Sequence, residues 1–227
     1  MSNALNQRLP RIVILGASGH GLVVLEAAHA QGYEIAGFVD SFKPVGLEIL
    51  GHKVLGHPDQ LPALMRAHRF VGGILAVSNN LTRSTVAAHV QRVAPDFQFV
   101  KVVHPRAWIS PSATVGAGTL VLTGAIIHAT CVVGEHAIVN TKVSLDHESE
   151  LSAFASLLPG VTTGGGVRVG EFSCVCAGST LSHQVKIGRH TVVGAGSLVL
   201  KDLPDEVLAF GSPARVIRPR RPDERHF

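Results

Sequence analysis

The sequence predicts a chain of two parts, an α/β N-terminal domain with Rossmann-like βαβ order and an all-β parallel β-helix after it. Two observations carry this prediction: a six-residue repeat runs through the second half, and β-branched runs alternate with helix-forming segments in the first. The composition agrees, since 24 glycines and only 5% aromatic residues among 227 suit coils with small side chains inside. We place the two domains at 1–104 and 105–217, with a tail at 218–227.

The repeat begins at Ile109 and keeps its phase for sixteen hexads, to Val199. Every sixth residue is aliphatic except Thr163, and a mostly small residue, such as Ala113 or Ala125, follows four positions later. A helix would repeat about every 3.6 residues and an amphipathic strand about every two, so this period predicts short strands joined by tight corners. We expect positive φ at the glycines that follow the aliphatic position, namely Gly116, Gly134, Gly170, Gly188 and Gly194.

The N-terminal third alternates strands and helices. We expect strands at 11–15, 34–40, 71–77 and 97–103, helices at 22–31 and 81–93, and a linker at 104–108. The loop GASGHG (16–21) follows the first strand, where backbone N–H groups and a helix N-terminus can hold a phosphate. Its spacing differs from the GxGxxG of dinucleotide-binding domains. Asp40 ends the second strand, where an acid would bind a ribose; the alternative is a tight turn with a solvated carboxylate.

Composition and charge exclude several classes of protein. With 46% hydrophobic and 16% charged residues, the chain is not disordered. A net charge of +4 with one Trp and one Tyr gives no basic stripe with interleaved aromatics, so we expect no nucleic-acid partner. No apolar run reaches the roughly 18 residues of a membrane span, and no signal-peptide core is visible, so we expect no membrane insertion and a cytoplasmic location. The three cysteines cannot build a disulfide framework, which fits a reducing compartment.

Several motifs along the chain together resemble one family. They are GASGHG, the segment from Asp40 to Lys43, Ser78-Asn79-Asn80, Asn140-Thr141, Asp146-His147-Glu148 and the closing segment from Gly211 to Arg215. Over 11–217 the chain is similar to the sialic-acid O-acetyltransferases and, within them, to the NeuD-like and PglD-like N-acetyltransferases of nucleotide-linked 4-amino-4,6-dideoxy sugars, as in the bacillosamine pathway. The resemblance implies a left-handed β-helix with about three hexads per turn. It also implies a homotrimer with active sites between subunits, acetyl-CoA as acyl donor, a nucleotide-linked amino sugar as acceptor, and no metal.

The same resemblance assigns roles to residues. It implies that His147 is the general base, a task that suits an imidazole because its unperturbed pKa is about 6.5. Glu148 would support the imidazolium, and Asp146 is the alternative for that role. Ser156 stands where relatives carry a second His, and it can only form hydrogen bonds. The implied cofactor-binding residues are Ser156, Gly164, Gly165, Gly166, Ala177, Gly178, Ala195 and Gly196, with Lys186, Arg189 and Lys201 as candidates for the CoA phosphates. The implied substrate-binding residues are Gly19, His20, Gly21, Asp40, Lys43 and Asn79.

We therefore expect an enzyme that transfers acetyl from acetyl-CoA to a 4-amino sugar, with O-acetylation of a sialic acid or related sugar as the alternative. His147 and His183 lie six hexads apart, as in a zinc site of the γ-carbonic-anhydrase type, but Gly188 stands where a third His would be needed. A non-catalytic prism protein is a further alternative, against which the His147–Glu148 pair argues. The basic tail from Arg218 has no periodicity, and we expect it to be mobile and without a role.

Overall fold

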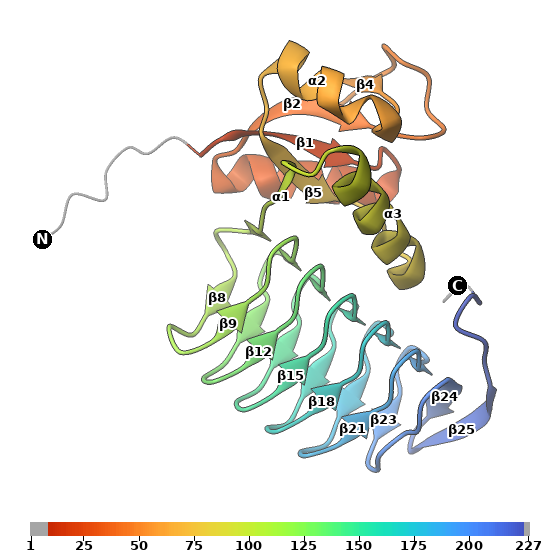
Figure 1. The fold of residues 1–227 in the computed structure, drawn as a ribbon. Helices are drawn as coiled ribbons and strands as arrows, with labels where there is room; N and C mark the ends of the chain where they lie inside the picture. The colour runs from red at the N-terminus through yellow and green to blue at the C-terminus, as the bar shows by residue number, and fades with distance from the viewer. Residues whose placement is uncertain (1–8, 225–227) are drawn as a thin grey trace, which may run out of the picture.

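The computed structural model describes residues 9–224 and shows an α/β domain followed by a long three-sided prism (Figure 1). Residues 1–8 of the predicted N-terminal domain and 225–227 of the predicted tail lie outside the described residues. The α/β domain holds a six-stranded sheet in the order β3-β4-β2-β1-β5-β6, parallel except for the β3–β4 pair. Its elements are β1 (Arg11–Leu15), α1 (Gly19–Gln31), β2 (Glu34–Val39), β3 (Glu48–Ile49), β4 (His52–Gly56), the 3₁₀ turn η1 (Pro58–Gln60), α2 (Leu61–His68), β5 (Gly72–Leu75), α3 (Asn80–Val93) and β6 (Gln98–Phe99).

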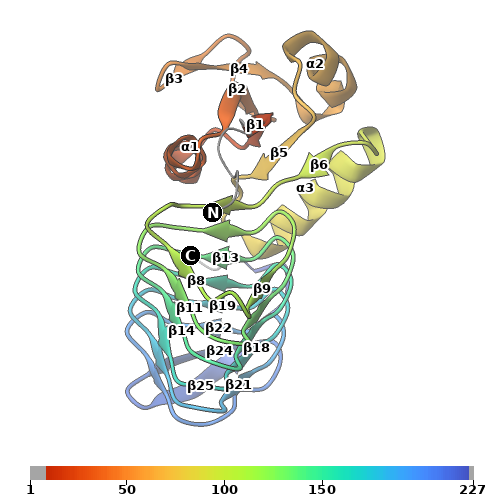
Figure 2. The same cartoon turned by 90° about the vertical axis from the view of Figure 1, so that its left-hand side faces the viewer.

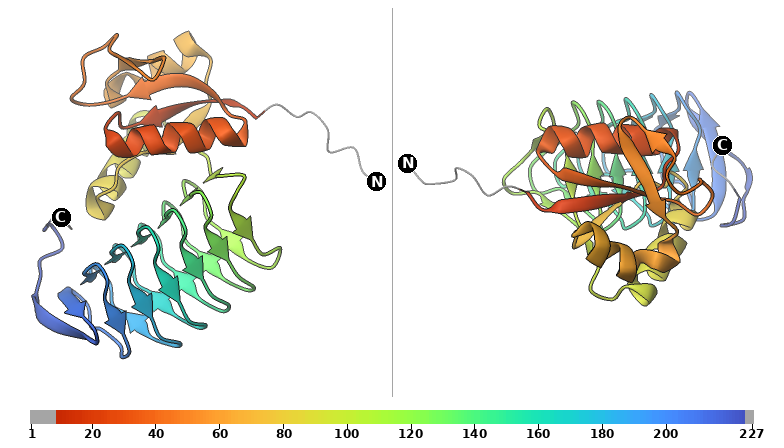
Figure 3. Two further views of the ribbon diagram at one scale, coloured as in Figure 1. Left: turned by 180° about the vertical axis from the view of Figure 1, so that it is seen from behind. Right: turned by 90° about the horizontal axis from the view of Figure 1, so that it is seen from above.

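Helices cover both faces of this sheet, as the right-hand view of Figure 3 shows. On one face α1 shares a core with β1 through Val24 and Ile14. On the other face Leu61 of α2 and Val90 of α3 share a core with Leu15 of β1. A strand covered on both sides is a nearly continuous apolar run, which explains the sequence RIVIL. The predicted Rossmann-like order is confirmed.

Residues 48–68 contain elements that the sequence did not predict. The strand β3 is only two residues long, and α2 has eight residues and begins next to two prolines, Pro58 and Pro62. Elements this short contain too few periods to be recognised from hydrophobic spacing. They extend the sheet beyond β2, so the second strand is internal rather than at the edge.

The second half of the chain is a parallel β-helix with three sheets, also as predicted. Each strand pairs with the strand eighteen residues later, for example Leu120 with Ile138, so one turn takes three hexads. The aliphatic residue of each hexad points inward, and Val121, Val139 and Leu157 are fully buried. The strands are β7 (Val102–Val103), β8 (Trp108–Ile109), β9 (Thr114–Val115), β10 (Leu120–Val121), β11 (Ile126–Ile127), β12 (Val132–Val133), β13 (Ile138–Val139), β14 (Ser144–Leu145), β15 (Glu150–Leu151), β16 (Ser156–Leu157), β17 (Thr162–Thr163), β18 (Arg168–Val169), β19 (Cys174–Val175), β20 (Thr180–Leu181), β21 (Lys186–Ile187), β22 (Val192–Val193), β23 (Leu198–Val199), β24 (Val207–Gly211) and β25 (Ala214–Pro219).

The structure corrects the expectation of positive φ at the glycines that follow the aliphatic position. Positive φ occurs at every sixth residue from Gly118 to Gly196, including non-glycines such as Glu148, and not at the glycines that follow the aliphatic position. Those glycines meet a different need, close approach between coils. A Cβ on Gly116 would lie 2.6 Å from the backbone nitrogen of Glu135, and one on Gly170 would lie 2.7 Å from that of Arg189.

The predicted strand at 97–103 is in fact two strands in two different sheets. β6 completes the N-terminal sheet by pairing with β5, whereas β7 pairs with β10 and is the first strand of the prism. The segment 104–108, which the sequence suggested as a linker, is therefore part of the prism: 104–107 form its first corner and Trp108 begins β8. The chain thus passes directly from β6, the last strand of the N-terminal sheet, to β7, the first strand of the prism.

The C-terminal segment closes the prism. β24 pairs with β22 and forms an antiparallel hairpin with β25. The tail expected to be mobile from Arg218 is packed as far as it is described: Arg220 is 5% exposed and donates to the carbonyl of His190, and Arg218 pairs with Glu224 at 2.9 Å. No helix within residues 9–224 has the length and apolar character that crossing a membrane requires.

The N-terminal domain lies over one of the three prism faces (Figure 2). That face is the sheet β25-β24-β22-β19-β16-β13-β10-β7, and we call it the covered face. Its outward residues Leu120, Ile138, Ser156 and Cys174 are all buried. The other two sheets, β23-β20-β17-β14-β11-β8 and β21-β18-β15-β12-β9, meet at the edge opposite the covered face.

Candidate functional site

His147 lies on this opposite edge, at the corner between β14 and β15, and we call the column of corners 146–148, 164–166, 182–184 and 200–202 the His147 edge. The side chains of His147 and Glu148 are 58% and 72% exposed. Nδ1 of His147 lies 3.2 Å from a carboxylate oxygen of Glu148, so the ring N–H at Nδ1 can donate to it. Asp146 accepts the backbone N–H of His147 at 2.8 Å and fixes the corner instead. Nε2 of the imidazole therefore remains free to accept a proton.

Gly165, one turn further along the edge, makes room for this imidazole. A Cβ on Gly165 would lie 2.5 Å from Nε2 and 3.0 Å from Nδ1 of His147, so the ring lies against the glycine backbone. His183 follows one more turn along, and a Cβ on Gly164 would lie 3.1 Å from its Nδ1. Both imidazoles thus lie beside the Gly164–Gly165 backbone. Within residues 9–224 no group of three His, Cys, Asp or Glu side chains is arranged to hold a metal.

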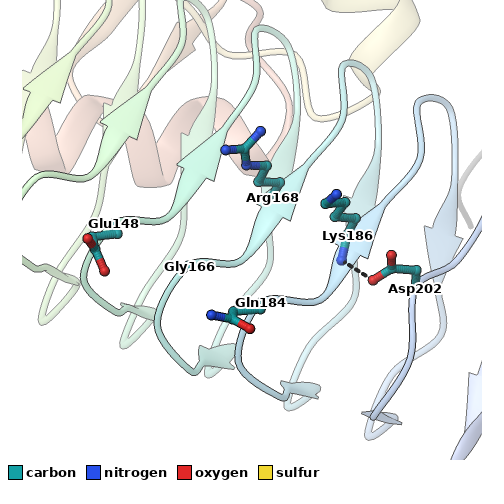
Figure 4. Close-up of a pocket in the computed structure, with 6 residues that line it drawn as sticks. All are labelled: Glu148, Gly166, Arg168, Gln184, Lys186 and Asp202. Carbon is teal, nitrogen blue, oxygen red and sulfur yellow. Dashed lines mark hydrogen bonds between the residues drawn. The ribbon is translucent and has the colours of Figure 1, made fainter.

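An open groove of about 510 Å³ runs along the His147 edge on the side of β15, β18 and β21 (Figure 4). Arg168 and Lys186 are paired in register on neighbouring strands, and both are exposed. Asp202 accepts the backbone N–H of Lys186 at 2.8 Å, so it anchors the corner. Lys186 is a predicted phosphate contact, and Arg168 next to it is a second cation of the groove that the sequence analysis did not single out. The eighteen-residue period could have identified Arg168, because it places this residue one coil before Lys186. The groove residues are Glu148, Gly166, Arg168, Gln184, Lys186 and Asp202.

The other predicted cofactor-binding residues lie on a second edge. Ala177, Gly178, Ala195 and Gly196 are exposed at corners between the covered face and the sheet that contains β14. The width of that sheet separates them from His147 within one chain. Arg189 lies on the third edge, between β21 and β22, whereas Lys201 is on the His147 edge.

The structure contradicts the prediction that Ser156 contacts the cofactor. It is 1% exposed on the covered face, where its hydroxyl donates to Oδ1 of Asn80 at 2.7 Å and accepts from the guanidinium of Arg83 at 3.3 Å. The hydroxyl is already used inside the chain and does not reach the His147 edge. The Ser156 side chain is therefore not available to a cofactor at the His147 edge of its own chain.

A pocket of about 300 Å³ lies at the carboxyl ends of β1, β2 and β5. This is the place where parallel α/β sheets bind nucleotides. Of the predicted substrate residues, Asp40, Lys43 and Asn79 line it. Gly16 and Ser18 of the predicted phosphate-binding loop also line it, as does Phe42, although none of these three was assigned individually. Asp40 also holds the pocket together, because its carboxylate accepts the N–H groups of Ala17, Phe42 and Lys43 at 2.7, 2.8 and 3.0 Å.

The rest of the GASGHG loop contributes less directly than predicted. Gly21 is buried and packs closely on the carbonyl of Gly16, so its role is helix–strand packing. The ring of His20 is largely buried, its Nε2 has no hydrogen-bond partner among the described residues, and burial together with the nearby Arg83 lowers its pKa to about 4. Gly19 is exposed at the start of α1. Neither Gly19, His20 nor Gly21 is among the pocket-lining residues.

The nucleotide-type pocket and His147 are therefore on different sides of the prism. The pocket belongs to the domain over the covered face, and His147 lies on the edge opposite that face (Figure 2).

Comparisons with known proteins identify the family and support the fold. Residues 11–90 match the family described as the PglD N-terminal domain. A variant of perosamine N-acetyltransferase from Caulobacter crescentus, solved with CoA and GDP-perosamine, is 35% identical, with a TM-score of 0.86 over 95% of this chain and 99% of that one. The acetyltransferase domain of PglB from Neisseria gonorrhoeae is 31% identical, with a TM-score of 0.84 over 92% of this chain and 100% of that one.

Among curated sequences, UDP-N-acetylbacillosamine N-acetyltransferase from Bacillus subtilis is 35% identical over 116 residues, which are 50% of this chain and 52% of that protein. The chain's matches to curated relatives span between 25% and 66% of their lengths. The solved structures match almost end to end and share the left-handed β-helix. The chain therefore belongs to the sugar N-acetyltransferase family of hexapeptide-repeat proteins.

Proposed function

We propose that the protein transfers the acetyl group of acetyl-CoA to the 4-amino group of a nucleotide-linked 4-amino-4,6-dideoxy sugar. One observation carries this proposal: an exposed His147–Glu148 pair, with Nε2 free, lies on a prism whose N-terminal domain presents a pocket of nucleotide type. The relatives solved with CoA and GDP-perosamine support the same pair of substrates. Such a reaction belongs to the biosynthesis of glycans, and three free thiols fit a reducing, cytoplasmic location.

The chemistry is direct transfer. The amine nitrogen attacks the thioester carbonyl, a C–N bond forms and the C–S bond breaks, and CoA leaves as a thiolate that takes up a proton. Nε2 of His147 receives the proton that the amine loses, and Glu148 stabilises the resulting imidazolium through Nδ1. A backbone N–H at the glycine-rich corners 164–166 is suited to stabilise the oxyanion.

We further propose that the active site is completed by a second copy of the chain, in a homotrimer. Within one chain the pocket and His147 lie on different sides of the prism, and the predicted cofactor residues lie on two edges. Placing the His147 edge of one subunit beside the Ala177–Ala195 edge of the next would bring the two sets of predicted cofactor residues together. Acetyl-CoA would then lie between subunits, with Arg168 and Lys186 next to its phosphates.

The proposal is tested by free-thiol release from acetyl-CoA with UDP-, GDP- and dTDP-linked 4-amino sugars. We expect turnover with one of them and an amide in the product. Turnover only with hydroxyl acceptors, such as a sialic acid, would instead establish the alternative, O-acetylation. No turnover with any acceptor would support a non-catalytic prism protein.

The variant His147→Ala tests the assignment of the base. We expect kcat to fall by roughly 10²–10⁴-fold, because a general base contributes about this much, while binding of CoA stays unchanged. The variant His29→Ala, at an exposed histidine of α1, is the matched control and keeps wild-type activity. An unchanged kcat in His147→Ala would contradict the assignment.

A further inference from the structure

Arg83, in the first turn of α3, is a fully buried cation without an acidic partner. Its exposure is 1%, and no ion pair within residues 9–224 involves it. Burial lowers its pKa to about 9, so the guanidinium remains charged near neutral pH. Burying a charge is costly unless hydrogen bonds replace the lost water. The hydrogen bonds of Arg83 therefore indicate what the buried charge is for.

These bonds join the wall of the nucleotide-type pocket to the prism. On the pocket side, the guanidinium donates to the carbonyls of Val77 at 2.9 Å and Ser78 at 3.1 Å. On the prism side, it donates to the carbonyls of His136 at 2.8 Å and Phe154 at 2.9 Å. The two prism carbonyls belong to equivalent corners of successive coils, eighteen residues apart.

Asn80 extends the same connection by one coil. Its side-chain N–H groups donate to the carbonyls of Phe172 at 3.1 Å and Ser173 at 3.0 Å, and its Oδ1 accepts from Arg83 and Ser156. The two residues that precede Asn80 in the chain, Ser78 and Asn79, line the pocket directly. The loop between β5 and α3 is thus fixed to three coils of the prism.

We infer that Arg83 is a positioning residue that holds the 77–79 wall of the nucleotide pocket in a fixed place relative to the prism. The inference rests on the proposed function, since it takes the pocket to bind the nucleotide of the acceptor. Arg83 itself is buried beneath the loop and does not contact the substrate. Its planar fork reaches carbonyls in several directions at once, which a lysine cannot do.

The test compares Arg83→Met, Arg83→Lys and the control Arg92→Met, an exposed arginine on the same helix. We expect Arg83→Met to raise KM for the sugar nucleotide about tenfold or more and leave KM for acetyl-CoA within about twofold. Arg83→Lys should recover part of the loss, and Arg92→Met should match wild type. If Arg83→Met does not fold, Arg83→Lys is judged by the same KM split.

A direct binding measurement separates this inference from the proposed reaction. Calorimetry with GDP, UDP or dTDP and, separately, with CoA needs no turnover. Weaker binding of the preferred nucleoside diphosphate with unchanged CoA binding supports a positioning role even if no amino sugar is acetylated. Folded variants that bind both ligands as wild type does, or that lose both equally, would overturn it.

Discussion

At the scale of single residues, the site depends on what surrounds His147 as much as on the imidazole itself. Glu148 occupies Nδ1, and Gly165 supplies a surface without a side chain against which the ring lies. The glycine is needed for space rather than for backbone conformation, because its φ is not positive.

The variant Gly165→Ala tests this packing. The new Cβ would fall 2.5 Å from Nε2 of His147, and because that side chain is exposed it can rotate away. We expect kcat to fall at least about tenfold, since small displacements of a catalytic group are costly, with little change in melting temperature. Gly170→Ala is the contrast: its Cβ would meet the backbone of Arg189, so it should lower the melting temperature. A fully active Gly165→Ala protein would show that the ring position does not matter.

The motif residues were predictable and their partners were not. The sequence indicated His147, Glu148 and Asn79 through the resemblance, and Asp40 also through its place at the end of the second strand. It could not indicate Arg83, because the groups that Arg83 binds are main-chain carbonyls up to 71 residues away, which have no sequence signal. Ser156 was assigned wrongly for the same reason, since its burial depends on how α3 packs on the covered face.

At the scale of elements, a column of stacked aromatic rings runs along one edge of the prism, with one ring from each of four successive coils. His136, Phe154, Phe172 and His190 follow one another at intervals of eighteen residues, with ring centroids 4.7–5.6 Å apart and nearly parallel planes. All four have positive φ, so stacking is compatible with the corner conformation. The six-residue period predicted these corners. It could not predict the short elements at 48–68, nor the division of 97–103 between two sheets.

His136, a member of this stack, is expected to make the folded protein less stable at acidic pH. Burial, followed by the nearby Arg83, lowers its pKa to about 4, so the folded protein keeps it neutral while the unfolded chain takes up a proton below about pH 6.5. Stability contributed by this difference is complete at neutral pH and is lost as the pH falls from about 6.5 towards 4, by up to about 3 kcal/mol.

The variant His136→Phe removes this titration and extends the stack with the residue type found at 154 and 172. We expect its free energy of unfolding to depend less on pH between 7 and 4, with the remaining dependence partly due to His20, whose pKa is also about 4. Chemical denaturation at several pH values measures both slopes. Equal slopes for the variant and the wild type would contradict this explanation.

At the scale of the whole molecule, the fold separates the two halves of the proposed site. The N-terminal domain is fixed by Arg83 and Asn80 to corners along one edge of the covered face, and the His147 edge is opposite that face. The proposed function therefore relies on an active site shared between two subunits, in which the pocket of one chain serves His147 of another.

Mixing two inactive variants tests this requirement most directly. His147→Ala removes the base, and Ser18→Trp fills the pocket at an exposed residue whose side chain makes no capping bond. The two chains, carrying different tags, are expressed together, and assemblies with both tags are isolated. In a cyclic trimer each mixed assembly has one interface with an intact pocket and an intact His147, so we expect about one third of wild-type activity. If mixed assemblies stay as inactive as either variant alone, each chain completes its own site and the account of a shared site is wrong.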